Sequence, residues 1–527
     1  MFGRPDFVKL FTEDAEVFMT DRGSAFVYGD VTVSFEEGEN LKVTLEAKET
    51  KVAYLGFRYN REWAEDTLFY GDTFERNYEE LYWRGFFPDR AMAWYFAGVT
   101  EGRLEAYGCK TRPNSFVFFT SDAEGFSVWM DVRCGAMPVS LGGRKLEVAT
   151  FVYHKEEASK SEAFRFMRRF CKKLCDDPVF PPRPVYGSNN WYYAYGISSA
   201  KDIIEDTKIL IRQTEGLGNR PYMVIDDCWQ PLARCGKSAQ GRPMDRGNEF
   251  FPDMKGLADE IRRMGAHPGI WFRPLRTEER YIDKSIITQH GHTVMDPSCP
   301  KTLELVAEDT ERLTKEWGYE LIKYDFATRD TLGIYVRAAQ ELFAIRDWSF
   351  KDTTRTSAEI IKDLYRTIYE HSNGAVIIGC NVIGHLAAGL IHIHRSGDDT
   401  SGRHYDRSVK YGISALALRY PQHKAFYDID ADCLCVTKDI PWDKNRDLID
   451  LYSRSATPFF ASISPDAVTE EVDRVMKEAY KLAEKQEASF EPLDWLNTVC
   501  PEHYMINGKE YRYKWYPAYG KEWVFAR

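Results

Sequence analysis

The sequence predicts a multidomain protein: an N-terminal antiparallel β-sandwich, a central (β/α)8 TIM barrel and a small C-terminal β region. Two patterns predict this fold. The first third of the chain alternates apolar and polar residues between turn signals, and the middle alternates short apolar runs with amphipathic helices. The length of 527 residues also exceeds that of one typical domain. The expected domains are residues 1–180, 181–465 and 466–527.

The N-terminal region contains two long stretches with the period-two pattern of strands, "SAFVYGDVTVSFEEGENLKVTLEAKETKVAYLGFRY" and "RLEAYGCKTRPNSFVFFTSDAEGFSVWMDVR". A helix is expected over residues 159–175. It is followed by a cluster of prolines that cannot continue a helix, and the domain boundary is therefore placed there: Pro178, Pro181, Pro182 and Pro184.

From residue 185 short apolar runs alternate with amphipathic helical segments, as in a barrel. The apolar runs expected to be strands are "VYGSNNWYY", "YMVIDD", "PGIWFRP", "LIKYDF", "AVIIGC", "LIHIHRSG", "KAFYDID" and "PFFAS". The helices expected between them cover residues 200–213, 253–264, 301–317, 355–370 and 444–455. Alternation of this kind over some 275 residues is typical of a (β/α)8 barrel. The connection between "AVIIGC" and "LIHIHR" is too short for a full helix. One more helix, 468–486, and a few closing strands complete the chain.

Composition and charge argue against several classes of binding partner and indicate where the protein is located. The net charge of −11 is spread along the chain without an acidic tail or a basic block, which argues against nucleic acid or an anionic membrane as a partner. The N-terminus has no basic segment followed by an apolar run, and no later segment is long enough to cross a bilayer. The 11 cysteines have no repeating spacing and no "CxxC", so we expect reduced thiols and a cytoplasmic location. No cofactor is expected, and homo-oligomerisation stays open.

Acidic residues gather at the carboxyl ends of the expected strands, where barrels carry their catalytic groups. They are Asp226, Asp227, Asp325, Asp398, Asp399, Asp430 and Asp432. The same rim carries Arg273, Lys323, Cys380, Asn381 and Arg395, and flat apolar surface comes from Trp191, Tyr192, Trp229 and Trp271. The mixture suits a neutral polyhydroxylated ligand, because carboxylates accept hydrogen bonds from hydroxyls and indoles cover C–H faces.

Two carboxylates that flank one bond are the minimal machinery of glycoside hydrolysis. Lys323 lies two residues before Asp325, so on a strand both side chains point to the same side. The ammonium group would keep Asp325 ionised, as a nucleophile requires.

Purely structural roles for these residues stay open. Asp430 and Asp432 could serve in caps or turns, Asp325 and Lys323 could form a structural ion pair, and the tryptophans could pack the top of the barrel. His392 and His394, on one face of a strand, could be a metal pair, although no third ligand is evident and a hydrogen-bonding role is favoured.

Several of these stretches resemble, in order, motifs of the α-galactosidase clan, glycoside hydrolase family 36 and its relatives, a melibiase-like group. "GDTFERNYEELYW" (71–83) is similar to a "GDAWERSYGDLEW" pattern, "NNWYY" (189–193) to the first barrel strand and "VIDDCWQ" (224–230) to "LDDGWF". "FPDMKGLADEIRRMGAHPGIWFRP" (251–274) resembles a segment that ends in "GLWVEP", and "IKYDF" (322–326) resembles the nucleophile strand "KYD". "GCNVIGHLAAGLIHIHRSGDDTSG" (379–402) and "DIDADCL" (428–434) are similar to the acid/base segment and to "NDPDCL".

The resemblance implies a retaining exo-α-glycosidase that acts by double displacement, with the two carboxyl groups about 5 Å apart. Asp325 would be the nucleophile. Asp399, four residues after Arg395, would be the acid/base, while alignment to a related "GDN" pattern would choose Asp398. The resemblance also implies substrate-binding roles for Asp226, Asp227, Lys323, Cys380 and Asn381. The position at the strand ends adds four residues to the expected substrate-binding set: Trp191, Trp229, Arg273 and Arg395. The alternatives are a raffinose synthase-like α-glycosyl transferase and a non-catalytic sugar-binding barrel.

The chain departs from the family pattern on the substrate side. "FRP" replaces "VEP", so Arg273 stands where a glutamate is usual, and "CNVIGH" replaces "CSGGG". An arginine at this position favours a substituted or anionic sugar over galactose itself.

Overall fold

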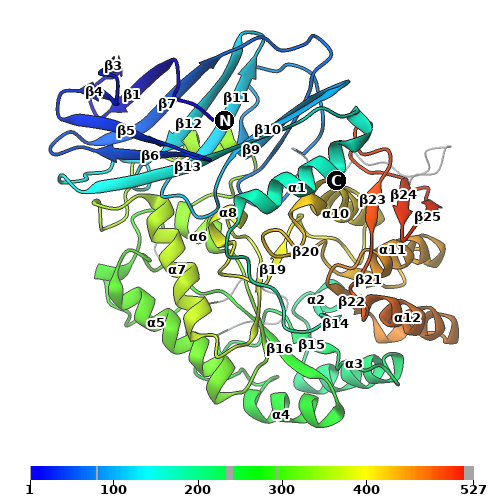
Figure 1. Ribbon diagram of the computed structural model, residues 1–527. Helices are drawn as coiled ribbons and strands as arrows, with labels where there is room; N and C mark the ends of the chain where they lie inside the picture. The colour runs from blue at the N-terminus through cyan, green and yellow to red at the C-terminus, as the bar shows by residue number, and fades with distance from the viewer. Residues whose placement is uncertain (1, 79–80, 233–240, 292, 516–527) are drawn as a thin grey trace.

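The computed structural model describes residues 2–78, 81–232, 241–291 and 293–515. Within these ranges an antiparallel sheet formed by the N-terminal part of the chain lies against a parallel sheet that is surrounded by helices (Figure 1). No helix in the described part of the chain is both long and apolar enough to cross a membrane.

The N-terminal sheet consists of thirteen antiparallel strands that run from Phe7 to Glu156. Their bounds are β1 Phe7–Thr12, β2 Glu16–Phe18, β3 Thr20–Asp21, β4 Ala25–Tyr28, β5 Val31–Glu37, β6 Leu41–Glu46, β7 Val52–Asn60, β8 Leu68–Asp72, β9 Met92–Thr100, β10 Arg103–Cys109, β11 Phe116–Asp122, β12 Gly125–Asp131 and β13 Lys145–Glu156. The strand order is β2-β1-β7-β12-β11-β9-β10-β13-β6-β5-β4-β3, with β8 paired to β9.

This order corrects the prediction of a two-sheet sandwich, because the hydrogen bonds form one continuous sheet. The sheet folds over on itself, however. Phe35 of β5 and Phe57 of β7 are far apart in the strand order, yet their ring centroids lie 5.5 Å apart. The period-two pattern therefore predicted the antiparallel strands of this region correctly, but it could not show that they form a single sheet.

The parallel sheet has the strand order of a (β/α)8 barrel, and we call it the barrel sheet. Neighbouring strands follow the chain from β14 to β20, and β22 returns to pair with β14. A further strand, β21, pairs with β22. The bounds are β14 Tyr186–Asn189, β15 Tyr222–Ile225, β16 His267–Phe272, β17 Leu321–Tyr324, β18 Val376–Gly379, β19 Ile393–Arg395, β20 Asp428–Asp430, β21 Leu434–Val436 and β22 Phe459–Ile463.

The helices lie close to their predicted positions. They are α1 Ala163–Leu174, α3 Ala200–Gln213, α4 Met254–Met264, α5 Pro300–Glu311, α7 Ser357–His371, α11 Trp442–Arg454 and α12 Glu470–Ala483. Local signals set their ends: Ser199 caps α3, Asp253 caps α4, and Thr356 forms a capping box with Glu359. Between β18 and β19 there is only a single turn, α8 Gly384–Ala387, as the short connection predicted.

The chain closes with a three-stranded antiparallel sheet, β23 Phe490–Pro492, β24 His503–Ile506 and β25 Lys509–Arg512. The closing strands predicted from the sequence extended to residue 527, and residues 516–527 lie outside the described residues.

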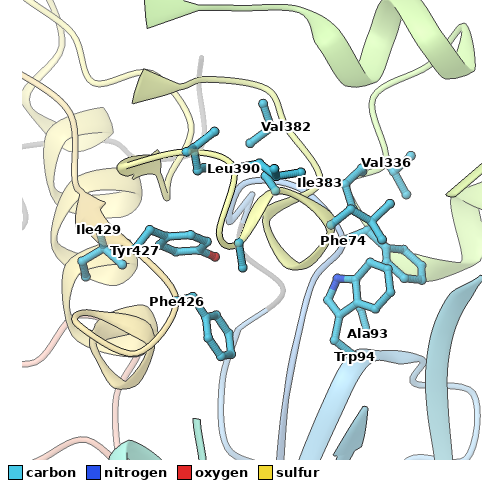
Figure 2. Close-up of a cluster of buried hydrophobic side chains, with 14 of the residues drawn as sticks. Phe74, Ala93, Trp94, Val336, Val382, Ile383, Leu390, Phe426, Tyr427 and Ile429 are labelled. Carbon is cyan, nitrogen blue, oxygen red and sulfur yellow. The ribbon is translucent and has the colours of Figure 1, made fainter. Parts of the chain in front are cut away.

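An apolar cluster joins the N-terminal sheet to the loops that follow the barrel strands (Figure 2). Phe74 and Trp94, with ring centroids 4.8 Å apart, come from the N-terminal side. Val336, Val382 and Ile383 come from the loops after β17 and β18, and all three are fully buried. The N-terminal sheet therefore covers the rim at which a barrel carries its functional groups.

Polar contacts cross the same junction. Arg419, which ends α10 (Ser414–Arg419), lies 2.8 Å from a carboxylate oxygen of Asp72, and it donates to the carbonyl and the hydroxyl of Thr73 at 3.1 and 2.7 Å. Gln422 donates to the other oxygen of Asp72 at 2.6 Å. Burial raises the pKa of Asp72, so its charge depends on these donors.

We predict that Arg419→Met lowers the free energy of unfolding by about 3–5 kcal/mol, because the variant leaves the carboxylate of Asp72 buried without its partner. Urea unfolding followed by tryptophan fluorescence measures the change. The matched control is Arg58→Met: Arg58 pairs with Asp122 at 2.8 Å on the solvent side of the N-terminal sheet, and its loss should cost less than about 1 kcal/mol. Equal effects of the two substitutions would contradict the prediction.

Candidate active site

Asp325 follows β17 directly and is held by the barrel. Its N–H donates to the carbonyl of Phe272 at 3.1 Å, which extends the ladder to β16 by one residue. Its carboxylate accepts the N–H of Phe326 at 2.7 Å and the indole N–H of Trp271 at 3.2 Å. Phe326 has φ of 60°, so the chain turns away from the strand at once and leaves the Asp325 carboxylate at the rim.

Lys323 lies one layer deeper. Its Nζ is 2.8 Å from Oδ2 of Asp226, an oxygen that also accepts from Asn189 at 2.7 Å. Burial opposes the ammonium charge, but the carboxylates of Asp226 and Asp325 outweigh it, so the pKa of Lys323 is raised. The direct ion-pair partner of Lys323 is therefore Asp226, and Asp325 acts on it as a second negative charge.

Asp227 lies beside Asp226 at the end of β15 and is 5% exposed. Its carboxylate accepts the N–H of Cys228 at 2.7 Å, and Cys228 has φ of 83°. The tight turn thus places two carboxylates side by side at the rim, as "VIDD" predicted.

Asp399 is held by arginines from two different parts of the chain. Arg395, at the end of β19, donates to its Oδ1 at 2.6 Å, and Arg76, from the segment after β8, donates to the same oxygen at 2.9 Å. The side chain of Asp399 is still 46% exposed. Enclosure in the site by itself would raise the pKa of Asp399, but the guanidinium groups of Arg76 and Arg395 outweigh this effect and hold the pKa well below its usual range.

Asp398 is more enclosed, with a side chain 20% exposed. Its Oδ1 lies 3.2 Å from Arg76 and its Oδ2 lies 3.2 Å from Arg407. Both of its oxygens therefore face a cation, whereas the two arginines that hold Asp399 meet at a single oxygen.

The charge of Lys323 interacts with those of both Asp399 and Asp325. The positive charge of Lys323 lowers the pKa of Asp399, and the negative charge of Asp325 raises the pKa of Lys323. The loops after β17 and β19 thus each carry a carboxylate whose charge interacts with that of Lys323.

Cys380 and Asn381 follow β18 at the floor of the site. Burial raises the pKa of the Cys380 thiol well above its usual range and outweighs the opposite effect of the neighbouring Arg395 and Arg76, whose Nη1 lies 3.7 Å from the sulfur. Asn381 has φ of 51° and donates from Nδ2 to Glu75 and Tyr78 of the N-terminal part. Its amide thus joins the barrel to the segment after β8.

Asp432 and Asp430 brace the site from the side of β20. Asp432 pairs with Arg395 at 2.8 Å, accepts the N–H and the hydroxyl of Thr400 at 2.9 and 3.0 Å, and accepts the hydroxyl of Tyr192. Burial raises the pKa of Asp430 to about 6. Asp432 therefore orients Arg395 and the loop that carries Asp399.

The two histidines of "HIH" are engaged with the protein. Nδ1 of His392 accepts the N–H of Ile377 at 3.0 Å, and the ring of His394 packs 4.8 Å from that of Tyr427. In the described ranges, no group of three or more His, Cys, Asp or Glu side chains is placed to hold a metal ion.

Of the predicted sugar-covering indoles, Trp191 is partly exposed, whereas Trp271 is 2% exposed and Trp229 is fully buried. Trp191 is half-buried at the start of α2 (Trp191–Ala194), and Trp271 contacts Asp325. Trp229 is 0% exposed, donates its indole N–H to the carbonyl of Trp271 at 2.8 Å and packs edge-on against Trp317. The prediction that Trp229 covers a sugar is therefore wrong, because the side chain is part of the core.

Arg273 also differs from its prediction. Its Nε and Nη2 pair with the two oxygens of Asp330 at 2.8 and 2.5 Å, and its guanidinium lies 4.3 Å from the ring centroid of Phe326. A buried carboxylate thus already balances its charge. This corrects the expectation that Arg273 selects an anionic sugar, since the sequence did not reveal that Asp330 neutralises it.

The residue that the sequence analysis missed is Arg76. The signal for it was a charged pair, Glu75 and Arg76, that directly follows the apolar strand "LFYGDTF" inside the first family-like motif. Both side chains are buried.

The comparison with solved structures finds proteins with this arrangement of a barrel sheet and an antiparallel sheet. TtGalA, the α-galactosidase from Thermus thermophilus solved with p-nitrophenyl α-D-galactopyranoside, matches with a TM-score of 0.60 and 14% identity over 96% of this chain and 99% of that chain. The GH36 α-galactosidase AgaA from Geobacillus stearothermophilus matches with a TM-score of 0.59 and 13% identity over 96% and 79%. The galactosidase domain of AgaSK, an α-galactosidase–sucrose kinase, matches with a TM-score of 0.58 and 13% identity over 94% and 72%.

This chain therefore has the fold of the family 36 α-galactosidases, and the predicted resemblance is confirmed at the level of the fold. No protein-family model and no curated protein matches the sequence.

We predict that Trp229→Phe lowers the free energy of unfolding by about 1–3 kcal/mol, because it removes a buried hydrogen bond and part of a packed ring. The KM for a glycoside substrate should stay unchanged. Thermal unfolding and steady-state kinetics measure the two effects, and Trp191→Phe serves as the paired variant at the rim. A raised KM in a fully stable Trp229→Phe protein would restore the sugar-contact interpretation.

Proposed function

We propose that the chain is a retaining exo-α-glycosidase of the α-galactosidase type. The observation that carries the proposal is the pair of carboxylates, Asp325 and Asp399, which follow β17 and β19 at the same end of the barrel sheet, where Asp325 contacts Trp271 and Asp399 pairs with Arg395. Two carboxyl groups placed around one glycosidic bond are what double displacement needs. The fold shared with α-galactosidases supports the same conclusion.

In the proposed reaction the carboxylate of Asp325 attacks the anomeric carbon, and the bond to the leaving oxygen breaks. Asp399 gives its proton to that oxygen, so the aglycone departs as an alcohol. Asp399 then takes a proton from water, whose oxygen attacks the same carbon and releases Asp325. Two inversions leave the sugar with its α configuration.

Asp399 is the better candidate for the acid/base because of how its oxygens are used. The two arginines of Asp399 share Oδ1 and its side chain is 46% exposed, whereas both oxygens of Asp398 face guanidinium groups and its side chain is 20% exposed. A proton donor needs an oxygen that can reach the substrate.

For the sugar we propose a terminal α-galactosyl residue or a close relative. The Thermus thermophilus enzyme was solved with p-nitrophenyl α-D-galactopyranoside and with stachyose. In this chain Asp226 and Asp227 supply acceptors for sugar hydroxyls, and Lys323 supplies a donor between them and the nucleophile. Because Asp330 neutralises Arg273, the geometry favours a neutral sugar.

The first test is Asp325→Ala with a panel of nitrophenyl α-glycosides. We expect turnover to fall by about 10⁴-fold or more, because the covalent step is lost. The fold should be kept, and the surface variant Asp466→Ala should stay fully active. Added azide should restore some turnover and give a β-glycosyl azide, since the anion attacks from the vacated side. An Asp325→Ala enzyme with wild-type turnover would refute the assignment, and proton NMR of the first product anomer would separate retention from inversion.

The second test compares Asp399→Asn with Asp398→Asn. Loss of the acid should slow substrates with poor leaving groups by about 10²–10⁴-fold and dinitrophenyl glycosides much less, because a good leaving group needs no proton. Asp398→Asn should show no such dependence on the leaving group. The opposite pattern would transfer the acid/base role to Asp398.

The third test is the pH profile. Since Arg76 and Arg395 hold the pKa of Asp399 low, its protonated form becomes scarce at a lower pH than for an ordinary aspartic acid. For a poor leaving group, kcat/KM should therefore already fall within the acidic range as pH rises, and for a dinitrophenyl glycoside the fall should be weaker. Identical profiles for the two substrates would argue against Asp399 as the proton donor.

A further inference from the structure

We infer that Arg76, from the segment after β8 of the N-terminal sheet, is a positioning residue of the active site that holds the carboxylates of Asp398 and Asp399 together with Arg395. The inference rests on the proposed function. It assigns the N-terminal part of the chain a direct share in the reaction of the barrel.

The contacts of Arg76 carry the inference. Its Nη1 donates to Oδ1 of Asp399 at 2.9 Å, and its Nη2 lies 3.2 Å from Oδ1 of Asp398. Its Nε and Nη2 donate to the hydroxyl of Tyr78 at 3.3 and 3.2 Å, which fixes the plane of the guanidinium. With a side chain only 6% exposed, Arg76 has little freedom to leave this position.

The backbone beside Arg76 is fixed to the same loop. The N–H of Asn77 donates to the carbonyl of Ser396 at 2.7 Å, and the N–H of Asp398 donates to the carbonyl of Asn77 at 3.2 Å. These two bonds form a parallel bridge between Asn77 and Gly397. A Cβ on Gly397 would lie 2.3 Å from the carbonyl oxygen of Tyr411, so the loop passes tightly between two backbones.

Neighbouring residues anchor the segment to two more loops. Phe74 packs edge-on against Trp94 and Phe116 at 4.8 and 5.2 Å in the apolar cluster of Figure 2. Glu75 accepts the N–H of Val336 at 3.1 Å, in the loop after β17, and the amide of Asn381, in the loop after β18. A single segment, 73–78, therefore braces the loops that follow β17, β18 and β19.

Several charged or titratable groups act on Asp399, and among them Arg76 is the cation that lies outside the barrel. The others are Arg395 and Lys323 from the barrel strands, the neighbouring Asp398 with its partner Arg407, and Asp432, Tyr192 and Cys435, which face the same arginine or carboxylate. Because an adjacent guanidinium favours the charged carboxylate, its removal should raise the pKa of Asp399 and free its side chain to rotate.

The experiment compares Arg76→Met with the wild type and with Arg58→Met, an arginine–aspartate pair on the solvent side of the same sheet. We expect the descending limb of kcat/KM for a poor leaving group to move to higher pH by about one unit or more in Arg76→Met. The maximal kcat should fall about tenfold or more as orientation is lost, while KM stays within about threefold. Arg58→Met should match the wild type.

The complementary test adds guanidinium chloride at millimolar concentration to Arg76→Ala, and the guanidinium ion should return the descending limb of the pH profile toward its wild-type position. If Arg76→Met does not fold, Arg76→Lys replaces it as the test. Lysine keeps the positive charge but not the planar guanidinium group, so this variant should fold, keep the wild-type position of the descending limb and have a lower kcat. Two results would overturn this inference while the wild type is active. One is a descending limb that does not move in Arg76→Met and Arg76→Ala, and the other is an unchanged kcat in Arg76→Lys. Either result leaves the proposed function standing. A wild type that hydrolyses no glycoside in the panel overturns both.

Discussion

The neutralisation of buried carboxylates by buried cations is the constraint on which the rest of this structure depends. An ionised carboxylate removed from water is costly unless a donor or a cation faces it. Four buried carboxylates each have a cation as partner: Asp226 has Lys323, Asp432 has Arg395, Asp330 has Arg273 and Asp72 has Arg419. The shape of the site follows from these pairs, because each of them fixes two loops at once.

The same constraint explains why two sheets are needed. The barrel alone supplies one cation, Arg395, that contacts the Asp399 carboxylate directly. The second comes from the N-terminal sheet, whose aromatic residues hold Phe74 and thereby the segment that carries Arg76. Packing in the N-terminal sheet thus holds the charge of Arg76 in place at the barrel rim, and the same contacts connect the loops that follow β17, β18 and β19.

The sequence predicted the fold well where the pattern is local. The helix expected at residues 200–213 begins and ends at those residues, and the single turn between β18 and β19 was evident from spacing alone.

Periodicity indicates which face of a helix or strand is buried, but it does not identify the residues that the face packs against. Trp229 looked like a rim residue because it follows a strand, and only the indole bond to Trp271 shows that it points into the core. Arg273 looked like a free cation until Asp330 was seen beside it. Arg76 could not be placed, since it meets Asp399 across 323 positions of sequence.

That separation has a consequence for how the protein is made. The N-terminal sheet is synthesised before the barrel and can collapse early around its own aromatic core, whereas the bridge between Asn77 and Gly397 forms only after the strand that ends at Arg395 has been synthesised and has paired. Long-range closure of this kind is slow, because chain entropy is lost before the contacts form. The pairing of Asn77 with Gly397 should therefore be among the last events of folding, and a chain arrested before it would be compact, rich in native secondary structure and without enzymatic activity.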